Sequence, residues 1–171
     1  MSGRVLVAYA SKHGGTAEIA QALAAAMRGA GVEAEARPAT QVTDLGGYRA
    51  AVVGSGVYAG RWAADARRFV RAHRAELRAM PTWLFCSGPT GGSLEGEAAV
   101  RDAGPGVVDT SMRRFDVGAR DYATFAGRVG EGMAGPFDRW VPKGDWRDFE
   151  QIAGWGRQIA AELTAGEVAD A

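Results

Sequence analysis

Short, continuous apolar runs alternate with amphipathic segments along the first half of the chain. The clearest runs are Val5–Ala10, Tyr48–Gly54 and Trp83–Cys86. A run of this length without polar alternation is typical of a parallel strand whose two faces are both covered by helices. The pattern therefore predicts three buried strands of an α/β protein.

Helical spacing follows the first two runs and recurs near the C-terminus. Ile19, Leu23 and Met27 recur every four residues, as on one face of a helix, and Gly29 and Gly31 are predicted to end that helix. The same spacing predicts two further helices, with inward-facing positions Phe69, Val70, His73 and Leu77 in one and Phe149, Ile152, Ile159 and Leu163 in the other. Asp145 is predicted to cap the last helix.

Weaker patterns predict two more strands. Val32–Arg37 alternates weakly, as a strand near a sheet edge does, and Arg113–Gly118 is predicted to be the last strand. A long, glycine-interrupted connection follows at 119–143, and the small and acidic residues 164–171 are predicted to be a disordered tail. Strands alternating with helices predict one α/β domain, residues 1–163, with a doubly wound five-stranded parallel sheet and helices on both faces.

Three loops of small residues follow three of the predicted strands. They are Ser11–Thr16, Ser55–Trp62 and Ser87–Gly92. In an open parallel sheet the ligand binds beyond the carboxyl ends of the strands, so these loops are expected to converge at one edge. Their convergence predicts a binding site there.

The first loop, Ser11–Thr16, has the chemistry of an anion site. It brings backbone N–H groups and the hydroxyls of Ser11 and Thr16 to the start of a helix, where the helix dipole favours negative charge. It lacks the Gly-Lys-Ser/Thr ending of a P-loop and the Gly-x-Gly-x-x-Gly pattern of dinucleotide folds, so ATP and NAD fit it poorly. The loop could also be only a structural turn between strand and helix.

Composition excludes several other functions. Lys plus Arg and Asp plus Glu both number 20, so no charge excess points to nucleic acid. Cys86 is the only cysteine and is interpreted as a small core residue; with two histidines in the chain, neither a metal site nor a Cys–His nucleophile pair is indicated. No catalytic side chain stands out. No apolar run is long enough to cross a bilayer and no signal peptide is evident, so a cytoplasmic location is expected.

The first loop and its flanking elements resemble those of flavodoxins. Ser-Lys-His-Gly-Gly-Thr after Val-Leu-Val-Ala-Tyr-Ala is similar to the loop that binds the FMN phosphate in that family, and the predicted order of elements matches over nearly the whole chain. More narrowly, residues 53–62, 69–73 and 118–122 and the Asp145-Trp146 pair are similar to the flavodoxin-domain, quinone-dependent protoporphyrinogen dehydrogenases. The resemblance implies a flavodoxin-like fold, FMN as cofactor and, at the finer level, oxidation of protoporphyrinogen IX with a quinone acceptor.

The resemblance also implies which residues meet the cofactor. The first loop would hold the phosphate, the second would lie along the isoalloxazine ring, the third would meet the pyrimidine edge of the ring, and Asp121 would sit close by, beyond the last strand. The implied cofactor-binding residues are Ser11, Lys12, His13, Gly14, Gly15, Thr16, Tyr58, Ala59, Gly60, Ser87, Gly88, Pro89, Thr90, Gly91 and Asp121. The implied partner is a small molecule or a quinone; peripheral membrane contact and a homodimer stay open.

Two departures from common flavodoxins leave three hypotheses. Electron-carrier flavodoxins are strongly acidic, whereas this chain has no net charge, and its third loop has no aromatic residue. An FMN-dependent oxidoreductase is the first hypothesis, and a non-enzymatic electron carrier is the second. The third is a flavodoxin-like binding module that has lost FMN.

Overall fold

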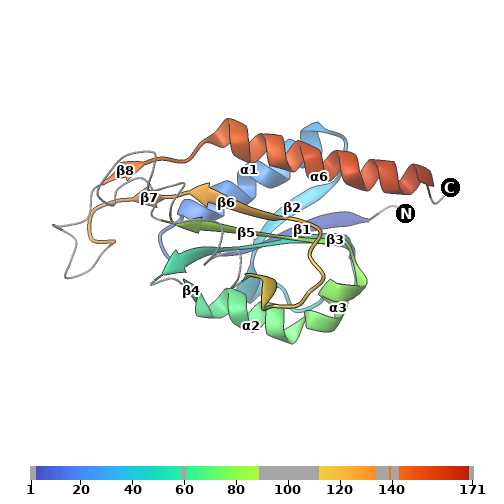
Figure 1. Cartoon of the computed structure of the whole chain (residues 1–171), viewed down its shortest axis with the longest axis horizontal. Helices are drawn as coiled ribbons and strands as arrows, with labels where there is room; N and C mark the ends of the chain where they lie inside the picture. The colour runs from blue at the N-terminus through green and yellow to red at the C-terminus, as the bar shows by residue number, and fades with distance from the viewer. Residues whose placement is uncertain (1–2, 59–60, 89–111, 134–138, 140–142, 170–171) are drawn as a thin grey trace.

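The computed structural model of the chain describes residues 3–58, 61–88, 112–133, 139 and 143–169. Five parallel strands form its central sheet in the spatial order β2–β1–β3–β5–β6 (Figure 1). Their bounds are β1 Arg4–Ala10, β2 Ala34–Pro38, β3 Tyr48–Tyr58, β5 Thr82–Gly88 and β6 Tyr122–Ala126. The predicted doubly wound, five-stranded parallel sheet is confirmed.

Three short strands stand apart from the parallel order. β4 (Arg61–Trp62) pairs antiparallel with the end of β3. β7 (Arg128–Val129) and β8 (Gly144–Asp145) form a separate antiparallel pair beyond the carboxyl end of β6. This pair, called the β7–β8 ladder below, projects past the edge of the sheet at the left of Figure 1.

Helices cover both faces of the sheet. α1 (Gly15–Gly29) and α6 (Phe149–Ala169) pack on one face; α2 (Ala64–Ala72) and α3 (Arg74–Ala79) cover the other, near the short helix η1 (Ala39–Gln41) (Figure 1). None of the helices in the described ranges is long and apolar enough to cross a lipid bilayer.

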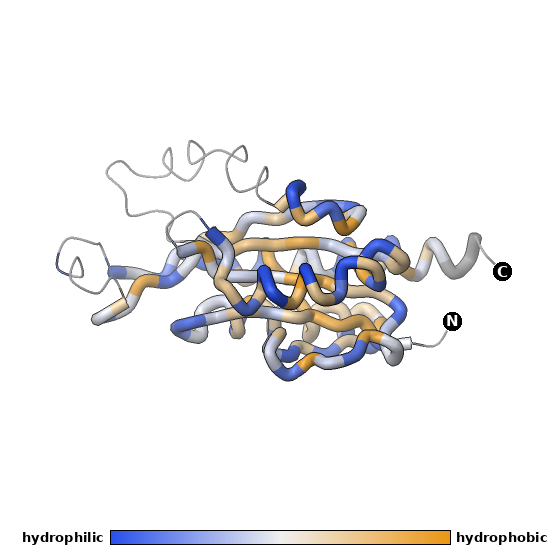
Figure 2. The backbone as a smooth tube through the Cα atoms, turned by 90° about the horizontal axis from the view of Figure 1, so that it is seen from below, coloured by the Kyte–Doolittle hydropathy of each residue, from blue (hydrophilic) through white to orange (hydrophobic). Residues whose placement is uncertain are grey.

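The alternation of side chains along β1 shows why the strands are apolar throughout. Val5 and Val7 join the core beneath α1 and α6, whereas Leu6 and Ala8 join the core above α2 and α3. β3 and β5 divide their side chains between the two cores in the same way, so these three central strands bury both of their faces, as the continuous apolar runs predict. Figure 2 shows the hydrophobic segments running through the middle of the molecule. Cys86 is confirmed as a core residue at 1% exposure, and burial raises the pKa of its thiol to about 11.

The prediction of a last strand at 113–118 is wrong. That segment turns tightly, with Phe115 and Asp116 N–H groups donating to carbonyls three residues back, and Asp116 adopts a positive φ of 50°. The last strand of the parallel sheet is β6, whose Phe125 is 2% exposed and packs against Phe85 of β5 at 5.9 Å between ring centroids. Phe125 is the one buried side chain of β6, so this strand packs on the core without a regular alternation of apolar and polar residues.

The start and end of the last helix also differ from prediction. The carboxylate of Asp148 accepts hydrogen bonds from the N–H groups of Glu150 and Gln151 at 3.0 Å, so Asp148 rather than Asp145 caps α6. Asp145 instead pairs with Arg147. The helix continues to Ala169, although the sequence predicted a disordered tail from Thr164.

Two strands run further than their apolar runs suggest. β3 continues to Tyr58 and β5 to Gly88, so Ser55–Tyr58 and Ser87–Gly88 are strand rather than loop. Gly54 and Ser55 of β3 pair with Phe85 and Cys86 of β5, which extends the ladder toward the edge where the loops begin. Polar and glycine residues are thus carried on rigid backbone to the carboxyl edge of the sheet.

Candidate functional site

The first loop turns directly into α1. Gly14 stands at the N-cap position with a φ of 82°, a conformation that glycine adopts without strain, and it offers no side chain to cap the helix. The free N–H groups of the first turn and the positive end of the helix dipole are therefore presented at Gly15 and Thr16.

Three hydroxyl groups lie at this helix start. Thr16 and Ser87, 4% and 6% exposed, have their side-chain oxygens 2.7 Å apart. The buried Oγ of Ser11 has no hydrogen-bond partner among the described residues. A buried hydroxyl without a partner costs free energy, so the Ser11 hydroxyl is positioned to donate a hydrogen bond to a bound ligand.

Residues of the first loop also contact the end of β3. The backbone N–H of Lys12 donates to the Tyr58 hydroxyl at 2.9 Å, and the Lys12 ammonium lies 4.5 Å from the centre of the Tyr58 ring. The His13 and Tyr58 rings are 6.4 Å apart with a 62° angle between their planes. Tyr58 is thus positioned by the loop rather than left to rotate freely at the rim.

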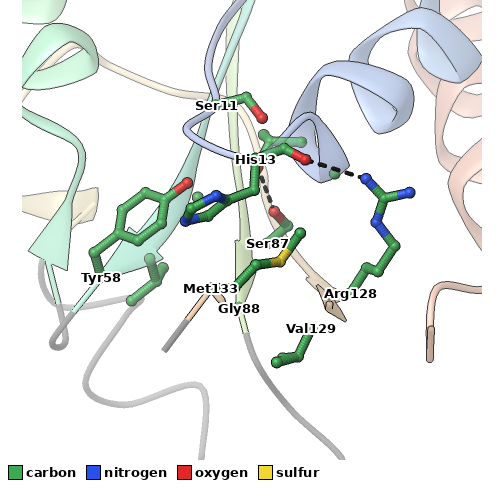
Figure 3. Close-up of a pocket in the computed structure, with 13 residues that line it drawn as sticks. Ser11, His13, Tyr58, Ser87, Gly88, Arg128, Val129 and Met133 are labelled. Carbon is green, nitrogen blue, oxygen red and sulfur yellow. Dashed lines mark hydrogen bonds between the residues drawn. The ribbon is translucent and has the colours of Figure 1, made fainter. Parts of the chain in front are cut away.

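A cavity of about 290 Å³ lies between these elements, close to the lower end of the range for small-molecule sites. Figure 3 shows His13 and Tyr58 on one side of it, Ser87 at its centre and Arg128 and Val129 on the other side. The complete lining is Ser11, His13, Gly15, Thr16, Gly56, Val57, Tyr58, Ser87, Gly88, Gly127, Arg128, Val129 and Met133.

Most predicted site residues in the described ranges meet at this cavity. Seven of them line it: Ser11, His13, Gly15, Thr16, Tyr58, Ser87 and Gly88. Lys12 and Gly14 belong to the same loop and lie next to residues that line the cavity: Lys12 lies over the Tyr58 ring, and Gly14 lies beside the Arg128 guanidinium. Ala59, Gly60, Pro89, Thr90 and Gly91 lie outside the described residues.

Asp121 does not lie where the sequence placed it. It precedes β6 instead of following the last strand, and its carboxylate accepts a hydrogen bond from the Trp155 indole N–H at 3.1 Å. The cavity lies at the opposite, carboxyl end of that strand, where Ala126 pairs with Gly88. The misplaced last strand is the cause of this error.

The side of the cavity formed by Gly127, Arg128, Val129 and Met133 was missed by sequence reasoning. These residues fall in the glycine-interrupted connection, where no periodicity marks them. The signal that could have found them is position: the residues after the last parallel strand reach the same edge as the other loops.

Two arginines of the β7–β8 ladder and its flank reach the start of α1. Arg147, whose side chain is 4% exposed, pairs with Glu18 and Asp145 and donates to the Gly15 carbonyl at 3.2 Å. Arg128 donates to the His13 carbonyl at 3.1 Å and has a nitrogen 3.7 Å from Glu18. The hydrogen bond from Arg147 holds the pKa of Asp145 at about 2, and the same pairing raises the pKa of Arg147. The ladder is therefore anchored to Glu18 of α1 by charge and to the first loop by hydrogen bonds to the carbonyls of His13 and Gly15.

Comparison with solved structures supports the fold. The chain is similar to the flavodiiron core of Flv1 from Synechocystis (TM-score 0.66, 19% identity), covering 96% of this chain but only 36% of that one. It is also similar to an archaeal flavodoxin (TM-score 0.61, 18% identity, 94% of this chain and 99% of that one). A flavodoxin from Streptococcus pneumoniae gives a TM-score of 0.60 at 20% identity, with 96% and 99% covered.

Sequence comparison gives the family. No curated protein matches the chain significantly in sequence. The family model described as flavodoxin domain matches residues 6–141, which include most of β1, the first loop, every other parallel strand and β7. The chain belongs to the flavodoxin domain family.

Proposed function

We propose that this protein binds FMN at the cavity and takes part in oxidation–reduction. FMN is the usual cofactor of flavodoxin-fold proteins. The observation that carries the proposal is the buried, unpartnered Ser11 hydroxyl beside the uncapped start of α1. A phosphate group accepts hydrogen bonds from both kinds of donor and is favoured by the helix dipole.

The residues present fit the two ends of the cofactor. Ser11, Gly15 and Thr16 would hold the phosphate through hydroxyl and backbone donors, without a lysine of the P-loop kind. Toward the ring, the cavity offers apolar and aromatic side chains, namely Val57, Tyr58, Val129 and Met133. A flat, largely apolar ring system is matched by such a lining, whereas a sugar or a free amino acid is not.

Bound FMN would supply one- and two-electron chemistry, and the contribution of the protein is binding, orientation and electrostatics. Ser87 and Gly88 end β5 at the cavity, so they stand on rigid strand backbone where hydrogen bonds to a ring edge could be made. The ion pairs of Arg147 hold the β7–β8 ladder against the start of α1 and so keep Val129 at the opposite wall.

The test is direct binding of flavin. The visible spectrum of the purified protein should show oxidised flavin, and the stripped protein should quench the fluorescence of added FMN. Ser11→Ala should weaken FMN binding by about tenfold, the value of one hydrogen bond to a charged group, and leave riboflavin binding within about twofold. A protein that is colourless and refuses added FMN would contradict the proposal and favour a binding module without flavin.

Two roles are compatible with a bound flavin. An electron carrier is supported by the match in length, since the chain covers 99% of an archaeal flavodoxin of the same fold. An enzyme is supported by the absence of net charge, since carriers of this fold dock on basic partners through acidic surfaces. At the finer level, the resemblance of residues 53–62, 69–73 and 118–122 supports a protoporphyrinogen dehydrogenase with a quinone acceptor.

Turnover separates these roles. The FMN-loaded protein is mixed with protoporphyrinogen IX and a menaquinone analogue, and separately with NAD(P)H and the same quinone. Multiple turnovers with the porphyrinogen support the dehydrogenase. Reversible reduction without turnover in either mixture supports the carrier.

A further inference from the structure

Arg128 lies across the loop assigned to the phosphate. It follows β6 at the carboxyl edge of the sheet and lines the cavity. A Cβ placed on Gly14 would be 3.7 Å from its Nη2, and one on Gly15 would be 3.9 Å from its Cβ. Its side chain therefore passes beside the two glycines that present the amides of the first turn, and Figure 3 shows its guanidinium next to the start of α1.

The two arginines at this helix start are held very differently. Arg147 is 4% exposed and is satisfied by two carboxylates and the Gly15 carbonyl. The Arg128 side chain is 33% exposed and has a nitrogen 3.7 Å from a Glu18 carboxylate oxygen, and the one hydrogen bond of its guanidinium within the described residues goes to the His13 carbonyl. A guanidinium has five N–H donors, so most donors of Arg128 are available to a ligand.

The local charge favours a cation beside the phosphate. Glu18, in the first turn of α1, places a carboxylate near the loop, and this carboxylate repels a phosphate dianion. Arg147 is already matched by Glu18 and Asp145. The Lys12 ammonium lies over the Tyr58 ring and Lys12 does not line the cavity, whereas Arg128 does. Arg128 is then the positive group at the cavity that can offset the charge of an incoming anion.

We propose that Arg128 is a phosphate-binding residue, so that this protein selects phosphorylated over unphosphorylated flavin by charge as well as by neutral donors. The inference rests on the proposed function, since it assigns the anion at this loop to FMN. A guanidinium pairs with two phosphate oxygens at once, and the resulting bonds are stronger than those of neutral donors. The selectivity for FMN over riboflavin should therefore fall as salt concentration rises.

The test compares FMN and riboflavin on the stripped full-length protein. Dissociation constants are measured by flavin fluorescence quenching at low and high NaCl for wild type, Arg128→Gln, Arg128→Lys and the control Arg157→Gln. Arg157 makes an exposed ion pair with Glu150 on α6 and does not line the cavity, so its variant reports the effect of losing any surface arginine. Urea unfolding of each variant checks that it folds.

The expected result is a loss confined to the phosphorylated ligand. Arg128→Gln should weaken FMN by about tenfold or more at low salt, leave riboflavin within about twofold and flatten the salt dependence of FMN binding. Arg128→Lys should recover part of the loss, because it restores the charge but not the paired geometry.

Three outcomes would overturn the inference. If Arg128→Gln binds FMN as wild type does, the phosphate is held by neutral donors alone and only this inference fails. If FMN and riboflavin weaken equally, Arg128 supports the cavity wall and does not contact phosphate. If the wild type binds neither flavin, the proposed function fails and takes the role of Arg128 with it.

Discussion

The hydroxyl oxygens of Thr16 and Ser87 lie 2.7 Å apart in the interior although the residues are 71 positions apart in sequence. Thr16 stands in the first turn of α1 and Ser87 near the end of β5. Their hydrogen bond ties the end of the first loop to β5 beside the cavity. The bond thus links the helix start that carries the proposed phosphate donors to the strand that ends at the proposed ring end of the site.

Removal of this bond should weaken both stability and flavin binding. Thr16→Val leaves the buried Ser87 hydroxyl without its partner, so the free energy of unfolding should fall by about 1–3 kcal/mol. FMN affinity should fall as well, because Thr16 lines the cavity. Urea unfolding and FMN titration measure the two effects.

The same change at an exposed threonine is the control. Thr164 on α6 bonds only the carbonyl one turn back, so Thr164→Val should change the unfolding free energy by less than about 0.5 kcal/mol. Equal destabilisation by both variants would show that the Thr16–Ser87 contact contributes nothing beyond the loss of a hydroxyl. A double variant with Ser87→Ala gives the coupling between the two side chains.

Much of the fold could be predicted because each strand of the sheet's centre is buried on both faces. Runs such as Val5–Ala10 are apolar without interruption and short, which is typical of a parallel strand covered on both faces. β6 was misplaced because it is an edge strand with a modest sequence, in which Phe125 does most of the packing. Single-residue packing of this kind leaves no period in the sequence.

The candidate site divides in the same way. Ser11, Thr16 and Ser87 could be predicted, because small and hydroxyl residues at strand ends mark a ligand edge in parallel sheets. Arg128 and Val129 could not, since their place depends on the β7–β8 ladder, whose strands are two residues each. The prediction for Asp121 was wrong because the last strand was predicted at 113–118, before this residue. Since β6 instead begins at Tyr122, Asp121 lies at the opposite end of the sheet from the cavity.

Asp121 should prove to be a structural residue. Its carboxylate accepts the Trp155 indole N–H, and the Trp155 ring packs on Phe85 and Phe125 at 6.4 and 5.7 Å between centroids. Asp121→Ala should lower the free energy of unfolding by about 1–2 kcal/mol through loss of this bond. The folded variant should bind FMN with a dissociation constant within about twofold of that of the wild type. A large, selective loss of FMN binding in a stable variant would instead return Asp121 to the cofactor site.

Gly54 should tolerate no side chain. A Cβ at this position would lie 2.0 Å from the Phe85 ring, which is fully buried and cannot move aside. Gly54→Ala should therefore destabilise the protein by about 3 kcal/mol or more, at the upper end for overpacked cores. The control is Gly29→Ala at the end of α1, where a Cβ meets nothing within 4 Å, and its effect should be small or slightly stabilising. Equal effects in chemical denaturation would contradict this account of β3–β5 packing.

The ion pair between Asp145 and Arg147 should contribute stability that disappears in acid. The hydrogen bond from Arg147 lowers the pKa of Asp145 from 3.8 to about 2 in the folded protein. Because the unfolded chain binds its proton at higher pH, this contribution is complete above about pH 4 and is lost as the pH falls through about 2. The Asp145 side chain is 44% exposed, so solvent screening limits the contribution to about 1 kcal/mol.

Urea unfolding of Asp145→Asn and wild type between pH 7 and pH 2 tests this expectation. The variant should be less stable by up to about 1 kcal/mol at pH 7, and the two curves should converge toward pH 2, where the wild-type carboxylate is itself protonated. Glu150→Gln provides the control, because Glu150 is 84% exposed in its pair with Arg157 and should show almost no difference at any pH. A difference between Asp145→Asn and wild type that stays constant down to pH 2 would mean that the shape of the Asp145 side chain, and not its charge, holds the β7–β8 ladder against α1.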